Sequence, residues 1–515
     1  MTTSYKYIFS IIVLIFFVSC KSTIVKENSS NSRVIIDLKN ISPINNGVFE
    51  GWGTSLCWWG NRLGDNSELS DKAVELFFSK EKGLGLNIIR YNIGGGDDPN
   101  HTHIKRSDSA MQGFWKNVDS NNNFDYDWSK DLAQRNILKK INSCTDDIII
   151  EFFSNSPPYF MTKSGCSSGS ITGFYNNITI NKLSEFASYL AEVTMQLQSL
   201  DGVVVTSLEP MNEPNSFSWA AFNNKQEGCR ISDSKSQSAL LILTRRELDR
   251  RGLQNVIVCG SDEYGPDLQA KKFNELTITA KNCISRINTH TYYGKNYKKL
   301  LQLACKNNKN LWISETDAPS VLGKNNGQMG PALALAKKII VDMNGLKPSA
   351  WIMWQVIADY LSESPFNGII DGSDLQNFEE SFWGTAIADF NNDTIILSKK
   401  YYVFGQFTKF IKPGSYVIYT ENDNYIAAFD PVEKSLSIVC INSDLVENKV
   451  FIDISSFINS YKKIISVRTS GKDLEHGENL SLIDIPITSY DKGNFSLELS
   501  PNSVTTIVLK DVELL

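Results

Sequence analysis

Short apolar runs alternate with amphipathic helical patterns between about residues 47 and 359. Several runs, such as residues 148–153, are almost continuous stretches of β-branched and aromatic side chains. This pattern is typical of parallel strands that are buried on both faces. The predicted strands cover residues 48–55, 86–93, 147–154, 203–209, 255–260, 286–292, 310–315 and 350–356.

The segments between these strands have the spacing of helices that bury one face. In residues 182–200 the apolar positions gather near one side of a helix, and residues 238–251 and 332–343 behave similarly. Eight repeats of strand and helix predict an α/β fold, a (β/α)8 TIM barrel. A doubly wound open sheet is the alternative, but it normally has fewer strands and a glycine-rich phosphate turn. Residues 94–96 are three glycines without the spacing or the following helix of that turn.

The pattern changes after about residue 409. Seven short alternating segments follow, at 415–420, 425–429, 436–441, 450–454, 464–467, 495–499 and 504–509. They predict an appended antiparallel β-sandwich over residues 409–515. A further strand within residues 33–45 precedes the barrel and can join the sandwich from the other end of the chain. The barrel itself is expected over residues 46–408.

The first 32 residues have the layout of an export signal followed by a polar tether. Lys6 precedes an apolar run at residues 7–18, too short to span a bilayer comfortably, and Cys20 follows. Cys20 resembles the lipid-modified cysteine of bacterial lipoproteins. We therefore expect a lipoprotein-type signal peptide at residues 1–20 and a polar tether at 21–32. The protein is then exported and anchored to a membrane through a lipid on Cys20, at the cell surface or in the periplasm; without that lipid it is secreted.

Composition narrows the function classes without defining one. The net charge is only -6 over 515 residues, and no basic stripe indicates a nucleic-acid partner. Aromatic residues are plentiful, with 10 Trp and 19 Tyr. They serve either as core packing or as platforms for sugars, and only their location distinguishes the two.

Two carboxylates stand where chemistry is expected in a barrel, at the carboxyl ends of strands. The fourth predicted strand leads into Asn212 and Glu213, and the seventh ends at Glu315. Glycoside hydrolysis requires one carboxyl group as proton donor and one as nucleophile or base. Arg90, at the end of the second strand, is a cation that can keep Glu315 ionised, and Tyr292 can donate a hydrogen bond to the same carboxylate.

An ordered set of motifs covers nearly the whole chain after the signal. They are EGWGTSLCWW at 50–59, GLNIIRYNIGGG at 85–96, EPMNEP at 209–214, QEGC at 226–229, THTY at 289–292, WISE at 312–315, WIMWQ at 351–355 and YYVFGQFTKFIKPG at 401–414. With this set the sequence resembles glycoside hydrolase family 30, and within it the endo-β-1,6-galactanase-like members. The resemblance implies a retaining double displacement with Glu213 as acid/base and Glu315 as nucleophile. It also implies a barrel fused to a sandwich that takes strands from both ends of the chain.

The sugar itself stays open at this point. The third strand runs into SNSPPY at 154–159 and lacks the Trp that many family relatives have there. Expected substrate contacts are aromatic platforms and hydrogen-bonding side chains near the strand ends. They are Trp58, Trp59, Trp219, Trp354, Arg90, Asn155, Asn212, His290 and Tyr292.

The leading prediction is an endo-β-1,6-galactanase acting on arabinogalactan-type side chains, with a polysaccharide or oligosaccharide as partner. Alternatives within the family are β-1,6-glucanase, xylanase and β-glucosidase or glucosylceramidase-like activity. A different class is a non-catalytic, glycan-binding surface lipoprotein. The presence of both Glu213 and Glu315 argues against that class, because binding alone requires no matched acid and nucleophile.

Two other groups of residues leave alternatives open. Asp97, His101 and His103 form an acid and His-x-His pattern that can bind zinc, but polar residues that face substrate are commoner in such a loop. We therefore predict no metal and no cofactor. Cys166 and Cys229 fall in loops where a disulfide is possible, although spacing alone does not establish one.

Overall fold

The computed structural model describes residues 32–106, 108–317, 327–358, 382–390 and 392–515. The predicted signal peptide with Cys20, and all of the tether except Ser32, lie outside the described residues. Within the described residues, no helix combines the length and the hydrophobicity that a bilayer crossing requires.

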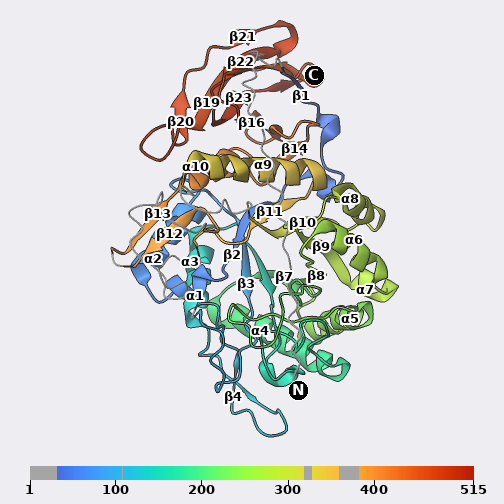
Figure 1. Cartoon of the computed structure of the whole chain (residues 1–515). Helices are drawn as coiled ribbons and strands as arrows, with labels where there is room; N and C mark the ends of the chain where they lie inside the picture. Colours follow the sequence, from blue (N-terminus) through green and yellow to red (C-terminus); the bar gives the residue numbers. More distant parts are fainter. Residues whose placement is uncertain (1–31, 107, 318–326, 359–381, 391) are drawn as a thin grey trace, which may run out of the picture.

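Eight parallel strands close into a barrel (Figure 1). Their order around the barrel is β10-β11-β2-β3-β6-β7-β8-β9. The strands are β2 Gly51–Ser55, β3 Ile88–Asn92, β6 Ile149–Phe153, β7 Val205–Glu209, β8 Ile257–Cys259, β9 Ile284–His290, β10 Asn310–Thr316 and β11 Ala350–Met353. Each of the eight predicted strands overlaps one of these, so the barrel prediction is confirmed. The open-sheet alternative is excluded because the sheet closes on itself.

Helices cover the outside of the barrel, and two of them, α9 and α10, lie between the barrel and the sandwich (Figure 1). They are α1 Trp59–Leu63, α2 Ser67–Phe78, α3 Leu132–Cys144, α4 Leu183–Asp201, α5 Ser234–Arg250, α6 Pro266–Glu275, α7 Ile278–Cys283, α8 Tyr297–Lys306, α9 Met329–Leu346 and α10 Lys399–Thr408. Short 3-10 turns occur at Leu38–Asn40, Asn45–Gly47, Tyr159–Met161, Ile180–Lys182 and Asp491–Gly493. The three predicted helices correspond to α4, α5 and α9.

The helices begin and pack as their sequences dictate. Asn66 caps α2 by accepting a hydrogen bond from the Leu69 N–H, and Asp233 caps α5 in the same way from Ser236. In α4 the side chains at helical spacing face the barrel and are buried. They are Leu183, Phe186, Leu190, Val193 and Leu197.

A two-layer sandwich packs beyond α9 and α10 (Figure 1). One sheet has the order β14-β15-β16-β23-β19-β20 and the other β1-β17-β22-β21. The strands are β14 Tyr416–Ile418, β15 Tyr425–Asp430, β16 Ser435–Asn442, β23 Ser503–Lys510, β19 Lys463–Ser470, β20 Ser481–Ile483, β1 Ser32–Ile35, β17 Asn448–Asp453, β22 Phe495–Leu499 and β21 Thr488–Ser489. Side chains such as Ile438 and Phe495 fill the space between the layers.

The sandwich departs from a purely antiparallel arrangement at one edge. Strand β1, from before the barrel, pairs parallel with β17, with Ser32 opposite Val450. Parallel pairing is possible here because the whole barrel forms the connection between the two strands. The exact domain limits, 33–45, 46–408 and 409–515, stay a prediction.

Three small hairpins or bridges complete the described strands. They are β4 Trp115–Lys116 with β5 Asp125–Tyr126, β12 Ala386–Asp389 with β13 Thr394–Leu397, and β18 Ile458–Ser460 with β24 Glu513–Leu514. None of these short strands was predicted from the sequence.

Candidate active site

Two carboxylates and an imidazole converge at the carboxyl ends of the barrel strands. Glu213 follows β7, Glu315 lies near the end of β10, and His290 is the last residue of β9. One carboxylate oxygen of each glutamate and one ring nitrogen of His290 lie within 4.8 Å of one another. Retaining glycosidases keep their two carboxyl groups about 5–5.5 Å apart, and inverting ones about 6.5–9.5 Å. The separation therefore favours the retaining geometry.

Glu213 projects from a constrained backbone position. Its φ is 43°, in the left-handed region, and its N–H donates a hydrogen bond of 2.9 Å to the carbonyl of Asp262. The indole N–H of Trp219 donates to the carbonyl of Glu213 at 2.9 Å. Both contacts fix the backbone, so the carboxyl group points toward His290 and keeps 15% of its side chain exposed.

Glu315 is almost fully buried and is contacted by donors. The Tyr292 hydroxyl donates to its Oε1 at 3.1 Å, and Arg90 Nη1 donates to its Oε2 at 3.3 Å. Burial raises the pKa of Glu315 to about 7, while the charges of His290 and Arg90 oppose the rise and that of Glu213 adds to it. The Glu315 pKa therefore depends on whether its partner Glu213 carries a proton.

Arg90 forms the centre of a buried charge network behind Glu315. Its guanidinium donates to Glu151 Oε1 at 2.9 Å and to Asp262 Oδ2 at 2.6 Å, and it lies over the ring of Phe153 at 4.1 Å. Burial alone would raise the pKa of Asp262, but the charges of Arg90 and His290 hold it well below its usual range. Arg90 therefore stays charged and fixed in place next to Glu315.

His290 bridges the two catalytic candidates. Its Nδ1 lies 3.1 Å from Glu213 Oε1 and 3.5 Å from Glu315 Oε1, and its Nε2 lies 3.3 Å from Asp262 Oδ2. Burial lowers the pKa of His290, but the negative charges of Glu315 and Asp262 outweigh it and raise the pKa well above its ordinary value. The three surrounding carboxyl groups therefore favour the protonated form of the ring.

Sequence reasoning did not predict three buried carboxyl groups in or beside this charge network. Glu151 accepts hydrogen bonds from Arg90, Arg286, Asn288 and Ser207, all buried inside the barrel. Asp262 and Glu263 come directly after β8 in the run Ser261-Asp262-Glu263. A sequence signal was available for that pair, because polar residues at a strand's carboxyl end were the criterion that found Glu213.

Two further carboxyl groups, those of Glu209 and Glu227, are buried and have raised pKa values. Burial raises the pKa of Glu209 well above its usual range, and among the described residues neither of its oxygens has a hydrogen-bond partner. Burial also raises the pKa of Glu227 to about 8, although Asn92 and the Gly95 N–H donate to it. Burial thus disfavours the charged form of both groups.

The predicted aromatic contacts occupy different environments. Trp354 follows β11, is half-buried, and packs edge-on against the fully buried Trp58 with ring centroids 6.0 Å apart. Trp59 belongs to the main hydrophobic core and donates its indole N–H to the Ser55 carbonyl at 2.8 Å. Because Trp59 has no exposed surface, we leave it out of the proposed sugar contacts. Trp219 is also buried and supports Glu213, as described above.

The two predicted amide contacts have buried oxygens without hydrogen bonds to other described residues. The unpaired oxygens are Oδ1 of Asn155 and Oδ1 of Asn212. Nδ2 of Asn155 donates a hydrogen bond to Asn92 at 3.2 Å. An unpaired buried acceptor costs stability unless a ligand or water pairs with it. Both amides are thus suited to accept hydrogen bonds from substrate hydroxyl groups.

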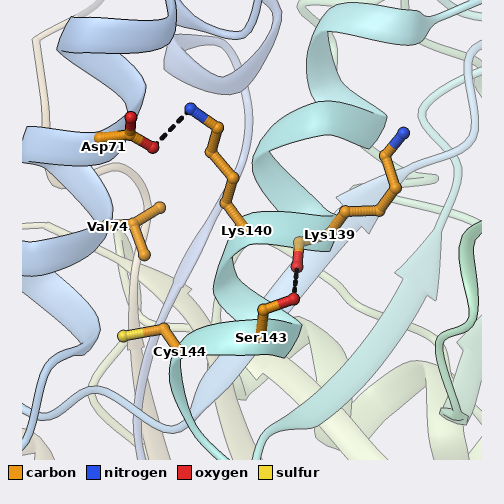
Figure 2. Close-up of a pocket in the computed structure, with 6 residues that line it drawn as sticks. All are labelled: Asp71, Val74, Lys139, Lys140, Ser143 and Cys144. Atoms are coloured by element: carbon orange, nitrogen blue, oxygen red, sulfur yellow. Dashed lines mark hydrogen bonds and ion pairs between the residues drawn. The ribbon is translucent and has the colours of Figure 1, made fainter.

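A hollow on the outer surface has no relation to these groups. It lies between α2 and α3 and is lined by Asp71, Val74, Lys139, Lys140, Ser143 and Cys144 (Figure 2). Its main feature is an ion pair between Lys140 and Asp71, 2.5 Å long. The last residues of α3 lead into the start of β6, so the hollow extends to the face opposite the carboxyl ends of the strands.

Fold and site together define a glycoside hydrolase: a closed (β/α)8 barrel with paired acids at the strand ends. The profile of "O-Glycosyl hydrolase family 30" matches residues 35–277. An endo-beta-1,6-galactanase of Hypocrea rufa is 31% identical over 427 residues, covering 78% of this chain and 80% of the relative. The chain therefore belongs to glycoside hydrolase family 30.

Two more distant matches were also found. An exo-beta-1,6-galactobiohydrolase of Bifidobacterium longum is 24% identical, covering 83% of this chain; the chain spans only 36% of that longer protein. The catalytic domain of a family 30 xylanase from Talaromyces cellulolyticus superposes with a TM-score of 0.68 at 16% identity, covering 93% of this chain and 100% of the xylanase chain. At that identity the superposition shows the fold alone.

Proposed function

We propose that this enzyme is a retaining endo-β-1,6-galactanase that acts on galactan side chains of arabinogalactan type. The observation that carries the proposal is the likeness to the Hypocrea rufa protein, whose name specifies endo action on β-1,6-linked galactose. The Bifidobacterium longum relative is named for the same sugar and linkage, although for exo action.

In the first step Glu315 attacks the anomeric carbon while Glu213 protonates the departing glycosidic oxygen. A covalent glycosyl–enzyme ester forms on Glu315, and the bond to the leaving sugar breaks. In the second step Glu213 takes a proton from water, the water oxygen attacks the anomeric carbon, and Glu315 leaves as a carboxylate. Two inversions give net retention of configuration.

The charges around the pair suit these roles. Arg90 and Tyr292 donate to Glu315 and stabilise its ionised form. Once Glu213 carries a proton, it no longer repels charge on Glu315, so the pKa of Glu315 falls and the nucleophile ionises. As Glu213 loses its proton to the leaving group, the cationic His290 beside it stabilises the new carboxylate.

Substrate contacts in this proposal follow from exposure and unpaired polar atoms. Trp354, supported by Trp58, presents an aromatic face on which a pyranose ring can stack. Asn155 and Asn212 accept hydrogen bonds from sugar hydroxyl groups through their unpaired oxygens.

Export and lipid anchoring through Cys20 form a second part of the proposal. The support is the sequence alone: Lys6, the apolar run at residues 7–18 and the cysteine that follows. A lipid anchor would place the enzyme at a membrane surface where it meets polymeric substrate.

The test is a product profile from protein lacking residues 1–20. The substrates are de-arabinosylated arabinogalactan, β-1,6-glucan, xylan and aryl β-glycosides. Short galacto-oligosaccharides from the first substrate alone support the proposal and its endo action. Products from a different substrate would change the proposed specificity and leave the proposed mechanism in place. If none of the four substrates yields products, a glycan-binding protein is favoured.

A further inference from the structure

Four side chains from two loops converge next to the active-site face of the barrel. Asp97, His101 and His103 belong to the loop after β3, and Cys166 belongs to the loop after β6. One donor atom from each lies within 4.8 Å of the others. Asp97 Oδ2 is 3.3 Å from His101 Nδ1 and 3.4 Å from His103 Nε2, and Cys166 Sγ is 3.3 Å from the same His103 nitrogen.

Three of the six donor separations are close to the edges of a tetrahedral zinc site. Zinc binds nitrogen and oxygen at about 2.0–2.2 Å and sulfur at about 2.3 Å, so neighbouring donors in a tetrahedron lie about 3.3–3.6 Å apart. The two Asp97–His edges fall at the lower end of that range, and the Cys166–His103 edge is about 0.2 Å shorter than a tetrahedral N···S edge. A thiolate with two imidazoles and one carboxylate is a donor set that favours zinc over magnesium or calcium, which prefer oxygen.

Further contacts orient the donors toward one point. Asp97 Oδ1 accepts a hydrogen bond from the Ser167 N–H at 2.9 Å, which leaves Oδ2 to face the imidazoles. Cys166 is fully buried, and the Phe222 N–H points to its sulfur at 3.4 Å, as amides do toward metal-bound thiolates. Nδ1 of His101 is buried and makes no hydrogen bond to the described residues.

We propose that Asp97, His101, His103 and Cys166 bind one zinc ion in a structural site. Four protein donors leave no open position for water or substrate, which distinguishes a structural from a catalytic zinc site. The proposal replaces our sequence-based expectation of no metal. The sequence showed three of the donors, but Cys166 is 63 residues from His103 and only the fold brings it to them. Cys166 and Cys229, for which the sequence left a disulfide open, are both free thiols in the structure.

The zinc would connect the loops that position the acid/base. The Cys166 loop pairs with the loop after β7: the Ser170 N–H donates to the Trp219 carbonyl at 3.2 Å, and the Ala221 N–H donates to the Ser170 carbonyl at 2.7 Å. Trp219 in turn donates to the Glu213 carbonyl. The proposed zinc site is thus linked to the backbone of Glu213 through two hydrogen-bonded loops.

The competing explanation is a hydrogen-bonded cluster without metal. Ser168 Oγ lies 3.1 Å from His103 Nε2 and 2.9 Å from Cys166 Sγ, so the side chains have partners among themselves. Metal content distinguishes the two explanations, and it does so whether or not galactan proves to be the substrate.

The experiment measures zinc in the purified protein lacking residues 1–20 by mass spectrometry, before and after incubation with zinc sulfate and removal of the excess. We expect about one zinc per chain, lost in the variants Cys166→Ser and His103→Ala. Matched controls are Cys305→Ser and His476→Ala, which remove an exposed thiol and an exposed imidazole elsewhere and should keep the zinc.

A second measurement needs no variant that might fold poorly. Cobalt exchanged into the wild-type protein should show the intense visible bands of tetrahedral coordination together with a thiolate charge-transfer band. A chelator that removes the metal should lower the melting temperature, and added zinc should restore it. The proposal is overturned if the zinc content is no higher than in the buffer both before and after incubation with zinc sulfate. It is also overturned if the cobalt spectrum lacks the thiolate band.

Discussion

The hydroxyl of Tyr292 donates a hydrogen bond of 3.1 Å to Oε1 of Glu315, the carboxylate oxygen that also faces His290. A donor to a carboxylate stabilises its ionised form, and a nearby negative charge does the reverse. Two effects on the pKa of Glu315 can therefore be removed separately: the hydrogen bond from Tyr292, which lowers it, and the negative charge of Glu213, which raises it.

Removing these influences should move the acidic limb of the pH profile in opposite directions. Burial raises the pKa of Glu315 to about 7, so kcat/KM should fall as pH drops through that region and the nucleophile is protonated. Tyr292→Phe should shift the limb to higher pH and lower kcat/KM roughly 10- to 100-fold, the equivalent of about 1.5–3 kcal/mol for a hydrogen bond to a charged group.

Glu213→Gln should shift the same limb to lower pH, because it removes the neighbouring negative charge. Both profiles are measured on an aryl β-galactoside with a good leaving group, which needs little acid assistance. Shifts of the same sign in both variants would contradict the charge relationships described here.

Glu213→Ala should separate substrates by their leaving groups. On galactan the variant loses the general acid, and kcat should fall about 10²–10⁴-fold. On an aryl galactoside with an acidic phenol, the loss in the glycosylation step should be much smaller. Steady-state kinetics on a series of phenols measure this, and an equal loss across the series would remove Glu213 from the acid role.

Arg286→Met should destabilise the barrel. Arg286 is buried, pairs with Glu151, and lies over the ring of Trp312 at 3.3 Å. Breaking a buried ion pair leaves an uncompensated charge and costs about 3–5 kcal/mol. Chemical denaturation measures the loss. The control Lys80→Met breaks the exposed pair with Asp147 and should leave the midpoint unchanged.

Cys20→Ser should release the protein from membranes. A lipid on Cys20 is the only anchor that the sequence analysis predicts, and an unmodified signal would leave the exported chain free. Cell fractionation of the full-length protein and the variant measures the difference. Equal membrane fractions for the two proteins would refute the lipoprotein prediction.

Sequence patterns predicted the barrel because its strands are buried on both faces. Runs such as Ile149–Phe153 are apolar apart from Glu151 and almost fully buried, and this one lies between the amphipathic helices α3 and α4 in the chain. The same patterns put Glu213 after the fourth strand and Glu315 at the end of the seventh, and the carboxyl ends of barrel strands all lie at one face. The catalytic roles of the two residues stay a prediction.

Features that depend on side-chain direction or distant contacts were not predictable in the same way. Trp58 and Trp59 are neighbours in sequence, yet one packs with Trp354 and the other with the core. The contact between His103 and Cys166 and the parallel pairing of β1 with β17 join segments far apart in the chain. No local periodicity records such contacts.

Proton NMR of the reaction on β-1,6-galacto-oligosaccharides tests the central claim most directly. The account predicts that wild-type enzyme first releases the β-anomer, which mutarotates later, and that Glu315→Gln loses activity by orders of magnitude while still binding the oligosaccharide. Initial release of the α-anomer, or retained turnover by Glu315→Gln, would contradict a double displacement through Glu315.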